Sequence, residues 1–409
     1  MQKRRVNDLV NLIVYLQLLY SPYTSMGSPV TTVVFPRILN ERSDSGELLV
    51  AIRSGHTLAL RKASVFRERL EVATLEEDRT TFHYMNGSGM ERNLYHDPQT
   101  GAAVMLTRGR GLRLVGILSP TERIQPSPAA KYNATGSIQH DIQRLEQRTS
   151  DVDISSDVLL KDSNQYAKSL SSVPPNKTET QVPEARSGSS YYPLKATCET
   201  RIAVDSKYFQ SFGRDKRKLV KYLAVLVAFT NLKFRTFHDY ILQFQLLITG
   251  IVIFTSKKEP FIKKANGDQS VMLSNTLADL NTYVEKDQIF RNDDAVILLT
   301  GLDLATNYGA GVAPRRSIVG LARLAAACGE GKAAIVEDMP RTFSSAPTMA
   351  HEIGHLVGSA HDGSTNDKLR YDGTGCPASE KKIMTPVSGT YSVQAFSYCS
   401  TYQVAEFIM

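Results

Sequence analysis

The sequence predicts an α/β fold with a twisted, mostly parallel sheet in its second half, preceded by a β-rich first half. From about residue 191 onward, strand-like and helical segments alternate, which is typical of a parallel sheet with crossover helices. Before about residue 127, only short β-type runs occur. All four cysteines lie at Cys198 or later, so disulfides are expected only in the second half. The 409 residues are therefore expected to form two separately built domains.

Residues 29–126 are expected to form a small β-rich domain. Turns that contain Gly, Asn or Asp separate its strand-like runs, as in an antiparallel β structure. The runs are residues 33–35, 48–52, 57–60, 103–106 and 112–118.

Residues 127–190 differ in composition from the segments on either side. Ser, Thr, Asp, Asn, Gln and Pro dominate, with Pro174-Pro175 and Gly188-Ser189-Ser190 near the end. Such a segment cannot bury enough apolar surface to fold by itself, so we expect a flexible linker or activation region. Arg186 is a candidate cleavage point within it.

Residues 191–409 are expected to form the α/β domain. Residues 216–237 and 269–285 have the apolar periodicity of helices. The run at 294–300 is apolar almost throughout, which is typical of a strand that is buried on both faces. The expected strands are residues 200–204, 241–255, 294–300, 319–325 and 333–336.

The first residues are typical of an export signal. Residues 3–5 are basic, residues 9–20 are mostly apolar, and small residues follow at 25–28. We therefore expect a signal peptide over residues 1–28 and a secreted protein. The alternative is an ordinary amphipathic helix.

Charge and hydropathy exclude two other classes of protein. The net charge is +7, but basic runs such as 214–218 are short and interrupted, so we expect solvated helix ends and no nucleic-acid binding. The most apolar later stretch, 241–255, is shorter than the roughly 20 residues that a membrane span requires. Three glycosylation sequons, at Asn86, Asn133 and Asn176, agree with secretion.

The most specific feature of the sequence is the segment 348–362, which is expected to begin as a helix. His351 and His355 are four residues apart and lie on one face of that helix, so both imidazoles can bind a single metal ion. Glu352 lies next to the first of these ligands. From there its carboxylate can reach a water molecule at the metal without binding the metal itself.

The next residues complete this site. Gly358 can take the left-handed conformation that ends the helix and turns the chain. His361 then returns as the third ligand, and the fourth position stays open for water, as in a catalytic zinc site. In that arrangement Glu352 is the base that takes a proton from the attacking water and gives it to the leaving amine.

This spacing is unlikely to arise by chance. A bare His-Glu-x-x-His occurs in roughly one chain in a hundred, and the added Gly and third His lower that frequency about a thousandfold. We assign no role to the isolated histidines, which are His56, His83, His96, His140 and His238.

The segment resembles the signature of the metzincins, His-Glu-x-x-His-x-x-Gly-x-x-His followed by a Met-turn. Residues 382–386 resemble that turn, in which Met384 would form a hydrophobic base beneath the three imidazoles. Asp362, directly after the third His, resembles the adamalysin or reprolysin branch. The resemblance covers residues 191–409, implies a metzincin catalytic domain, and is greatest to secreted reprolysins of the tick salivary type.

The resemblance implies a secreted zinc-dependent metalloendopeptidase, made as a zymogen. Residues 34–37 and 93–97 resemble the prodomain of these enzymes, which would correspond to residues 29–126. The implied cofactor is one catalytic Zn²⁺, and the implied substrates are proteins or peptides, such as host or extracellular matrix proteins, cleaved by a monomer. Residues that resemble the edge strand, which pairs with an extended substrate, are Gly320, Leu321 and Ala322.

Two further features come from the resemblance alone. Glu199 and Asp294 match positions that bind Ca²⁺ in the family, and Cys376 is implied to pair with Cys399. Many relatives silence the zinc with a prodomain thiolate, but residues 1–197 contain no cysteine. A prodomain here would therefore have to act by steric blockage or through another ligand.

The sequence leaves three alternatives for the pairing of Cys328. In the family, the counterpart of Cys328 pairs with a cysteine at the end of the domain, and this chain stops at Met409, short of that position. The domain is thus expected to be truncated at its C-terminus. Cys328 is then unpaired, pairs with Cys198, or has its partner beyond the truncation.

Two other functions remain possible on the sequence alone. One is a catalytically silent protein that keeps the zinc fold as a binding surface, and the other is a zinc hydrolase that acts on small amides. The complete set of histidines and Glu352 disfavours the first, and the peptide-binding edge strand disfavours the second.

Overall fold

The computed structural model describes most of both halves of the chain. The described residues are 31–40, 47–128, 131–134, 136–144, 193–255, 259–306, 313–316, 318–366, 371–372, 374–386 and 394–409. The expected signal peptide and residues 145–190 of the expected linker lie outside them.

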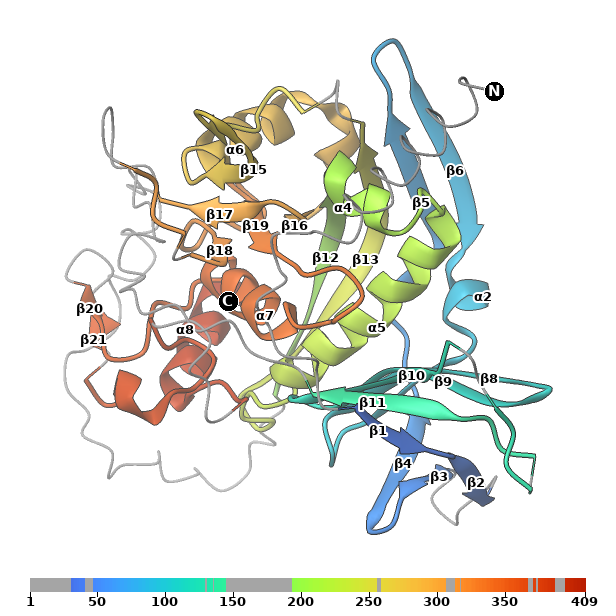
Figure 1. Cartoon of the computed structure of the whole chain (residues 1–409). Helices are drawn as coiled ribbons and strands as arrows, with labels where there is room; N and C mark the ends of the chain where they lie inside the picture. The colour runs from blue at the N-terminus through green and yellow to red at the C-terminus, as the bar shows by residue number, and fades with distance from the viewer. Residues whose placement is uncertain are drawn as a thin grey trace, which may run out of the picture.

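A seven-stranded sheet forms the centre of the molecule, in the order β18-β19-β16-β12-β13-β5-β6 (Figure 1). The four inner pairings are parallel and the pairing at each end is antiparallel, so the expected mostly parallel sheet is confirmed. The strands are β18 (Gly320–Leu321), β19 (Ala333–Glu337), β16 (Ala295–Thr300), β12 (Leu194–Val204), β13 (Leu242–Phe254), β5 (Phe66–Leu75) and β6 (Thr80–Asn86).

Helices cover both faces of this sheet. Side chains alternate between the faces along β16: Ile297 packs into the core beneath α5 (Lys216–Phe234) and α7 (Ala346–Leu356), whereas Leu298 packs against α6 (Thr276–Lys286). This alternation follows from the two-residue period of a strand. Because both faces are covered, every residue of β16 is buried, as the sequence predicted.

One predicted helix is partly wrong. Residues 269–285 divide into strand β15 (Asp268–Leu273) and helix α6, with Ser274 and Asn275 between them. The valine and methionine of β15 are buried and match both a strand and a helix pattern over so short a run, so periodicity alone does not separate them. Strand β15 forms a small sheet with β14 (Lys264–Ala265) and β17 (Asp303–Ala305).

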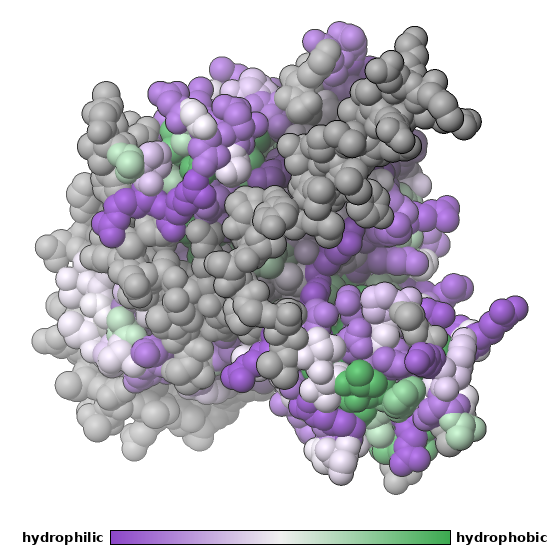
Figure 2. Space-filling view, viewed as in Figure 1, coloured by the Kyte–Doolittle hydropathy of each residue, from purple (hydrophilic) through white to green (hydrophobic). Residues whose placement is uncertain are grey.

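The first half forms a nine-stranded antiparallel sheet, in the order β1-β11-β10-β9-β8-β7-β4-β3-β2. The space-filling view in Figure 2 shows an apolar area near β1 and β2, where Val33 and Leu39 are about half exposed (52% and 51%). The strands are β1 (Thr31–Val34), β2 (Arg37–Asn40), β3 (Leu48–Arg53), β4 (His56–Lys62), β7 (Leu94–Asp97), β8 (Ala102–Gly109), β9 (Gly111–Ser119), β10 (Glu122–Pro126) and β11 (His140–Arg144).

Strand β11 differs from the expectation of a linker that begins at residue 127. It pairs with both β1 and β10. Ile142 and His140 point into the protein, and His140 accepts a hydrogen bond from the Leu114 amide at 3.0 Å through Nε2. Composition did not reveal this strand because only two of its inward positions are buried, one of them by a polar ring.

The two halves share a sheet and a core, which also differs from the expectation of two separately built domains. Strands β5 and β6 come from the first half, yet they extend the sheet of the second half beyond β13. One hydrophobic cluster contains Phe66 and Leu94 of the first half together with Leu223 and Leu246 of the second.

The remaining elements are short or lie at the end of the chain. Among the residues that the structure describes, no helix is both long and apolar enough to cross a lipid bilayer. These elements are α2 (Gly87–Glu91), α4 (Ser206–Ser211), η3 (Gln288–Phe290), β20 (Thr365–Asn366), β21 (Tyr371–Asp372), η4 (Ala378–Glu380) and α8 (Tyr398–Ile408).

Candidate active site

Helix α7 supplies two of the three expected metal ligands. Every residue of the helix is buried, because α5, β18 and β19 surround it. His351 and His355 lie one turn apart on the same face, and their side chains are directed to a common point with that of His361.

The loop after α7 brings His361 back to the helix. Gly358 has a φ of 99°, which a residue with a Cβ rarely adopts, so a glycine is needed where the chain turns. Beyond it, the Ala360 amide donates to Gln403 Oε1 of α8 at 2.8 Å. Gln403 thereby holds the loop between the second and the third histidine, a role that no pattern in the sequence indicated.

The three Nε2 atoms form a nearly equilateral triangle. The distances are 3.0 Å between His351 and His355, 3.1 Å between His355 and His361, and 3.2 Å between His351 and His361. Among the described residues, these three are the only group of at least three side chains whose ligand atoms converge in this way.

Backbone carbonyls fix the orientation of two of the rings. The Nδ1 of His351 lies 2.7 Å from the Ile383 carbonyl, and the Nδ1 of His355 lies 2.8 Å from the Ser359 carbonyl. Because a carbonyl oxygen only accepts, each Nδ1 carries the proton and each Nε2 keeps its lone pair. Two such lone pairs repel one another at 3.0 Å unless a cation lies between them.

Burial keeps these rings neutral. It lowers the pKa of His351 to about 4 and that of His361 to about 3. Burial, together with the two neighbouring histidines, places the pKa of His355 well below its usual value. At neutral pH the rings therefore offer lone pairs to a metal ion without first losing a proton.

The donor set fits zinc. Nitrogen ligands at about 2.0–2.1 Å in a tetrahedral arrangement lie about 3.3 Å from one another, close to the observed 3.0–3.2 Å. Three imidazoles leave one tetrahedral position for water or substrate, and this arrangement is typical of catalytic sites.

Glu352 lies beside the histidines and against the edge strand β18. Its side chain is 2% exposed. A Cβ built on Gly320 would lie 2.2 Å from Glu352 Oε1 and 2.7 Å from its Cδ. The carboxylate therefore occupies the space that a side chain at position 320 would fill.

Met384 lies beneath the active-site helix and is fully buried. A Cβ built on Gly354 would lie 2.7 Å from its sulfur, so this glycine permits the close approach of turn and helix. The same turn holds the site through its backbone: the Ile383 carbonyl binds His351, and the Met384 carbonyl accepts from the Asp362 amide at 2.8 Å. A glycine in the middle of an expected helix, such as Gly354, is the signal in the sequence that indicates a close approach of this kind.

Asp362 connects the third histidine to the last helix. Its Oδ1 accepts from the Ser397 hydroxyl at 2.6 Å, at the N-cap of α8. Burial raises the pKa of Asp362 to about 6, against the effect of the Ser397 hydrogen bond. Through this hydrogen bond the side chain ties the loop after His361 to α8.

The expected edge strand is present but short. Strand β18 contains Gly320 and Leu321, pairs antiparallel with β19, and ends the strand order of the central sheet. Ala322 follows it directly and is buried.

Glu199 and Asp294 lie next to one another, as a shared calcium site would require. The Asp294 Oδ2 accepts from the Glu199 amide at 2.8 Å, and the Glu199 carboxylate forms an ion pair with Arg67 of β5. The guanidinium of Arg67 already neutralises one of the two carboxylates. Calcium binding at this place stays a prediction.

Cys376 and Cys399 form a disulfide, with a Cα–Cα distance of 6.2 Å. It joins the segment before the Met-turn to α8. Cys198 is buried and Cys328 is exposed, and neither forms a disulfide. The structure therefore does not show the Cys198–Cys328 pairing, which was one of the three alternatives.

Comparisons with known proteins agree with this geometry. The model of metallo-peptidase family M12, of the reprolysin type, matches residues 194–397. The chain is 23% identical to a metalloproteinase of Tityus obscurus over 86% of this chain and 89% of that protein. It is 25% identical to the venom metalloproteinase BumaMPs1 of Olivierus martensii, over 80% of this chain and 76% of that protein.

A third relative is matched only in part. The zinc metalloproteinase-disintegrin-like protein BmMP of Bungarus multicinctus is 30% identical over 54% of this chain and 31% of its own length. These relatives do not distinguish the tick salivary type from other reprolysins. Family M12 implies a zinc cofactor, which the three imidazoles fit. The chain is a metalloendopeptidase that belongs, through residues 194–397, to the reprolysin-type metallo-peptidases of family M12.

Proposed function

We propose that the protein is a secreted, zinc-dependent endopeptidase that is made as a zymogen. In this proposal residues 1–28 are an export signal and the β-rich first half is the prodomain. The observation that carries the enzymatic part is the triangle of three Nε2 atoms with the Glu352 carboxylate beside it. The similarity to venom metalloproteinases supports an extracellular location.

His351, His355 and His361 would hold the zinc ion, and Glu352 would handle the proton. When bound, zinc supplies Lewis-acid polarisation of the scissile carbonyl. Glu352 accepts the proton of the attacking water and delivers it to the nitrogen of the leaving amine. The backbone of β18 aligns an extended peptide substrate, so that the scissile bond lies over the carboxylate.

The substrates in this proposal are proteins with an accessible extended segment, outside the cell. Strand addition at β18 recognises the backbone of any extended segment, and side-chain pockets add preference. We therefore expect hydrolysis of denatured proteins and little activity on small acyl amides, which have no strand to add.

Substitution of the base tests the proposal. The chain, cleaved within residues 145–190, is expected to hydrolyse denatured casein, and a chelator is expected to stop the reaction. In Glu352→Ala the rate should fall about 10²- to 10⁴-fold, because general base catalysis contributes a factor of that size. Metal analysis should still find one zinc per chain, since the ligands are unchanged.

Glu330→Ala is the matched control, because Glu330 is exposed whereas Glu352 and the three histidines are buried. Its activity should stay within about twofold of the parent, as for most surface substitutions. Full activity in Glu352→Ala, or activity that survives removal of the metal, would contradict the proposal.

A further inference from the structure

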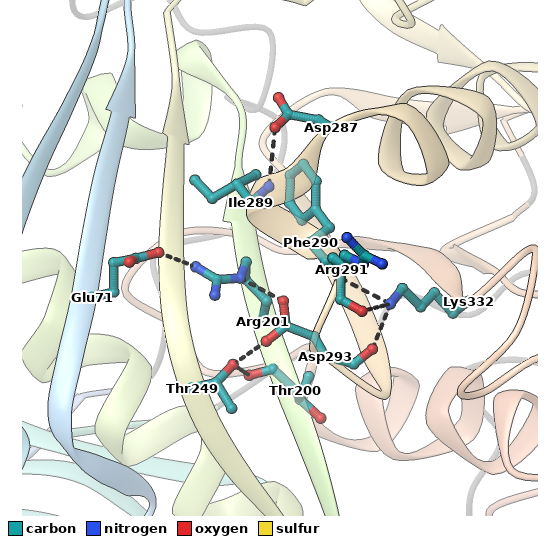
Figure 3. Close-up of polar contacts among 10 residues, drawn as sticks. All are labelled: Glu71, Thr200, Arg201, Thr249, Asp287, Ile289, Phe290, Arg291, Asp293 and Lys332. Atoms are coloured by element: carbon teal, nitrogen blue, oxygen red, sulfur yellow. Dashed lines mark hydrogen bonds and ion pairs between the residues drawn. The ribbon is translucent and has the colours of Figure 1, made fainter.

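Arg201 connects three strands of the central sheet and reaches from the second half of the chain to the first. Arg201 of β12 is in register with Gly250 of β13, and Gly250 is in register with Glu71 of β5. The guanidinium nevertheless bonds to Glu71, at 2.7 Å between Nη1 and Oε1 (Figure 3). Its side chain thus crosses the whole of β13 to meet a strand of the first half.

The glycine at position 250 makes this crossing possible. A Cβ built there would lie 2.3 Å from Arg201 Nη1 and 2.9 Å from Cζ. The register also shifts at this place, where Thr249 lies between the pairs that involve Ile248 and Gly250. A local bulge and the absence of a side chain together open a path for the guanidinium over β13.

The guanidinium of Arg201 lies between two carboxylates only when Glu71 is present. Its Nε donates to Asp293 Oδ2 at 2.6 Å, and that carboxylate is 1% exposed. Lys332 Nζ donates to the Asp293 carbonyl at 2.6 Å and so places a second cation nearby. Asp294 also acts electrostatically on Lys332, so this cation has a carboxylate nearby whether or not Glu71 is present. Without Glu71, the Nη1 of the largely buried Arg201 side chain loses its charged partner.

The edge of β13 also needs a partner. The strand Leu242–Phe254 contains no charged residue and no proline, the two features that protect exposed strand edges from unwanted pairing. Strand β5 covers this edge in parallel register from Gly250 to Phe254. A catalytic domain without β5 would expose a long apolar edge, and Arg201 would lose its contact with Glu71.

From these observations we propose that the edge of β13 and Arg201 form a permanent docking site for residues 31–144. Hydrolysis of the chain between residues 145 and 192 would then give a two-chain protein and no free catalytic domain. The docking site lies at the end of the sheet opposite β18 (Figure 1). The inference rests on the proposed function only for the expectation that the zymogen is cleaved between residues 145 and 192.

Association of the two fragments tests this inference independently of activity. A recognition sequence for a site-specific protease is inserted between residues 150 and 185 of the full chain carrying Glu352→Ala, which prevents self-digestion. After cleavage at micromolar concentration, both fragments are expected to co-elute in size-exclusion chromatography. Separate elution of the first half in native buffer would overturn the proposal, whatever the parent enzyme hydrolyses.

Two variants show whether Arg201 is responsible. Glu71→Gln, which removes the charge of the partner, and Gly250→Ala, whose Cβ would occupy the path of the guanidinium, should each raise the dissociation constant of the fragments at least about tenfold. Glu68→Gln is the matched control: it makes the same chemical change on the same strand at an exposed position, and it should change the constant by less than about twofold. Equal effects of Glu68→Gln and Glu71→Gln would contradict the role of Arg201.

Discussion

At the scale of single residues, the spacing of the histidines was sufficient to predict which side chains meet. His351, His355 and His361 converge because a helical turn and a glycine turn have fixed geometries. The carbonyls of Ile383 and Ser359 that orient two of the rings could not be predicted, since every residue has a carbonyl and only the tertiary fold selects one.

Gly320 is expected to position the catalytic carboxylate. In Gly320→Ala the new Cβ would overlap Glu352 Oε1, which lies 2.2 Å away, so the carboxylate must move. A displacement of about 1 Å costs roughly 10²-fold in rate. We expect kcat to fall by about that factor while KM and the zinc content stay close to those of the parent, as steady-state kinetics and metal analysis would show.

Gly329→Ala is the control for this prediction. Gly329 is exposed, and its nearest neighbours would lie 3.8 Å from the added Cβ, an ordinary contact. A parental kcat in Gly320→Ala, or a loss of zinc together with kcat, would show that Gly320 does not act through Glu352.

At the scale of secondary-structure elements, the sequence located α5, β13, β16 and β19 closely, because long apolar runs and clear periodicity define them. It did not detect β5 and β6 at all. Residues of β5 alternate less regularly, with three exposed polar residues before Leu70, so the run has no strand period at its start. Short strands such as β18 depend on their partners more than on their own sequence.

The contact between α7 and the Met-turn predicts that a substitution that usually stabilises a helix destabilises this protein. Gly to Ala within a helix normally stabilises a protein by about 1 kcal/mol. In Gly354→Ala the added Cβ lies 2.7 Å from the sulfur of Met384, and such overpacking costs about 1–3 kcal/mol. We therefore expect a net loss in the free energy of unfolding, measured by chemical denaturation.

In a Met384→Ala background the same substitution should stabilise the protein, because the overlapping sulfur is absent. If Gly354→Ala stabilises both backgrounds equally, the close packing of helix and turn is not a constraint on this position.

At the scale of the whole molecule, the two halves of the chain do not form the two separate domains that the sequence predicted. Composition and cysteine placement indicated two domains, yet β5 and β6 complete the sheet of the second half, and one core contains Phe66 and Leu223. Sequence patterns report that a strand is buried, but they do not report which strand lies beside it. Pairing between residues as distant as Glu71 and Gly250 therefore becomes visible only in the fold.

The resemblance to reprolysins correctly implied the type of enzyme, because the active-site helix and its turn are local in sequence. It did not imply the attachment of the first half through Arg201. That attachment depends on a glycine in β13 and a carboxylate in β5, neither of which belongs to a recognisable motif.

The coordination of zinc in the full chain tests the central claim most directly. X-ray absorption at the zinc edge, with one equivalent of zinc, should show three imidazole nitrogens at about 2.0–2.1 Å and one further oxygen or nitrogen. The same measurement on His361→Ala should show one imidazole fewer. A sulfur ligand in the parent protein, or a spectrum that His361→Ala leaves unchanged, would contradict the site described above.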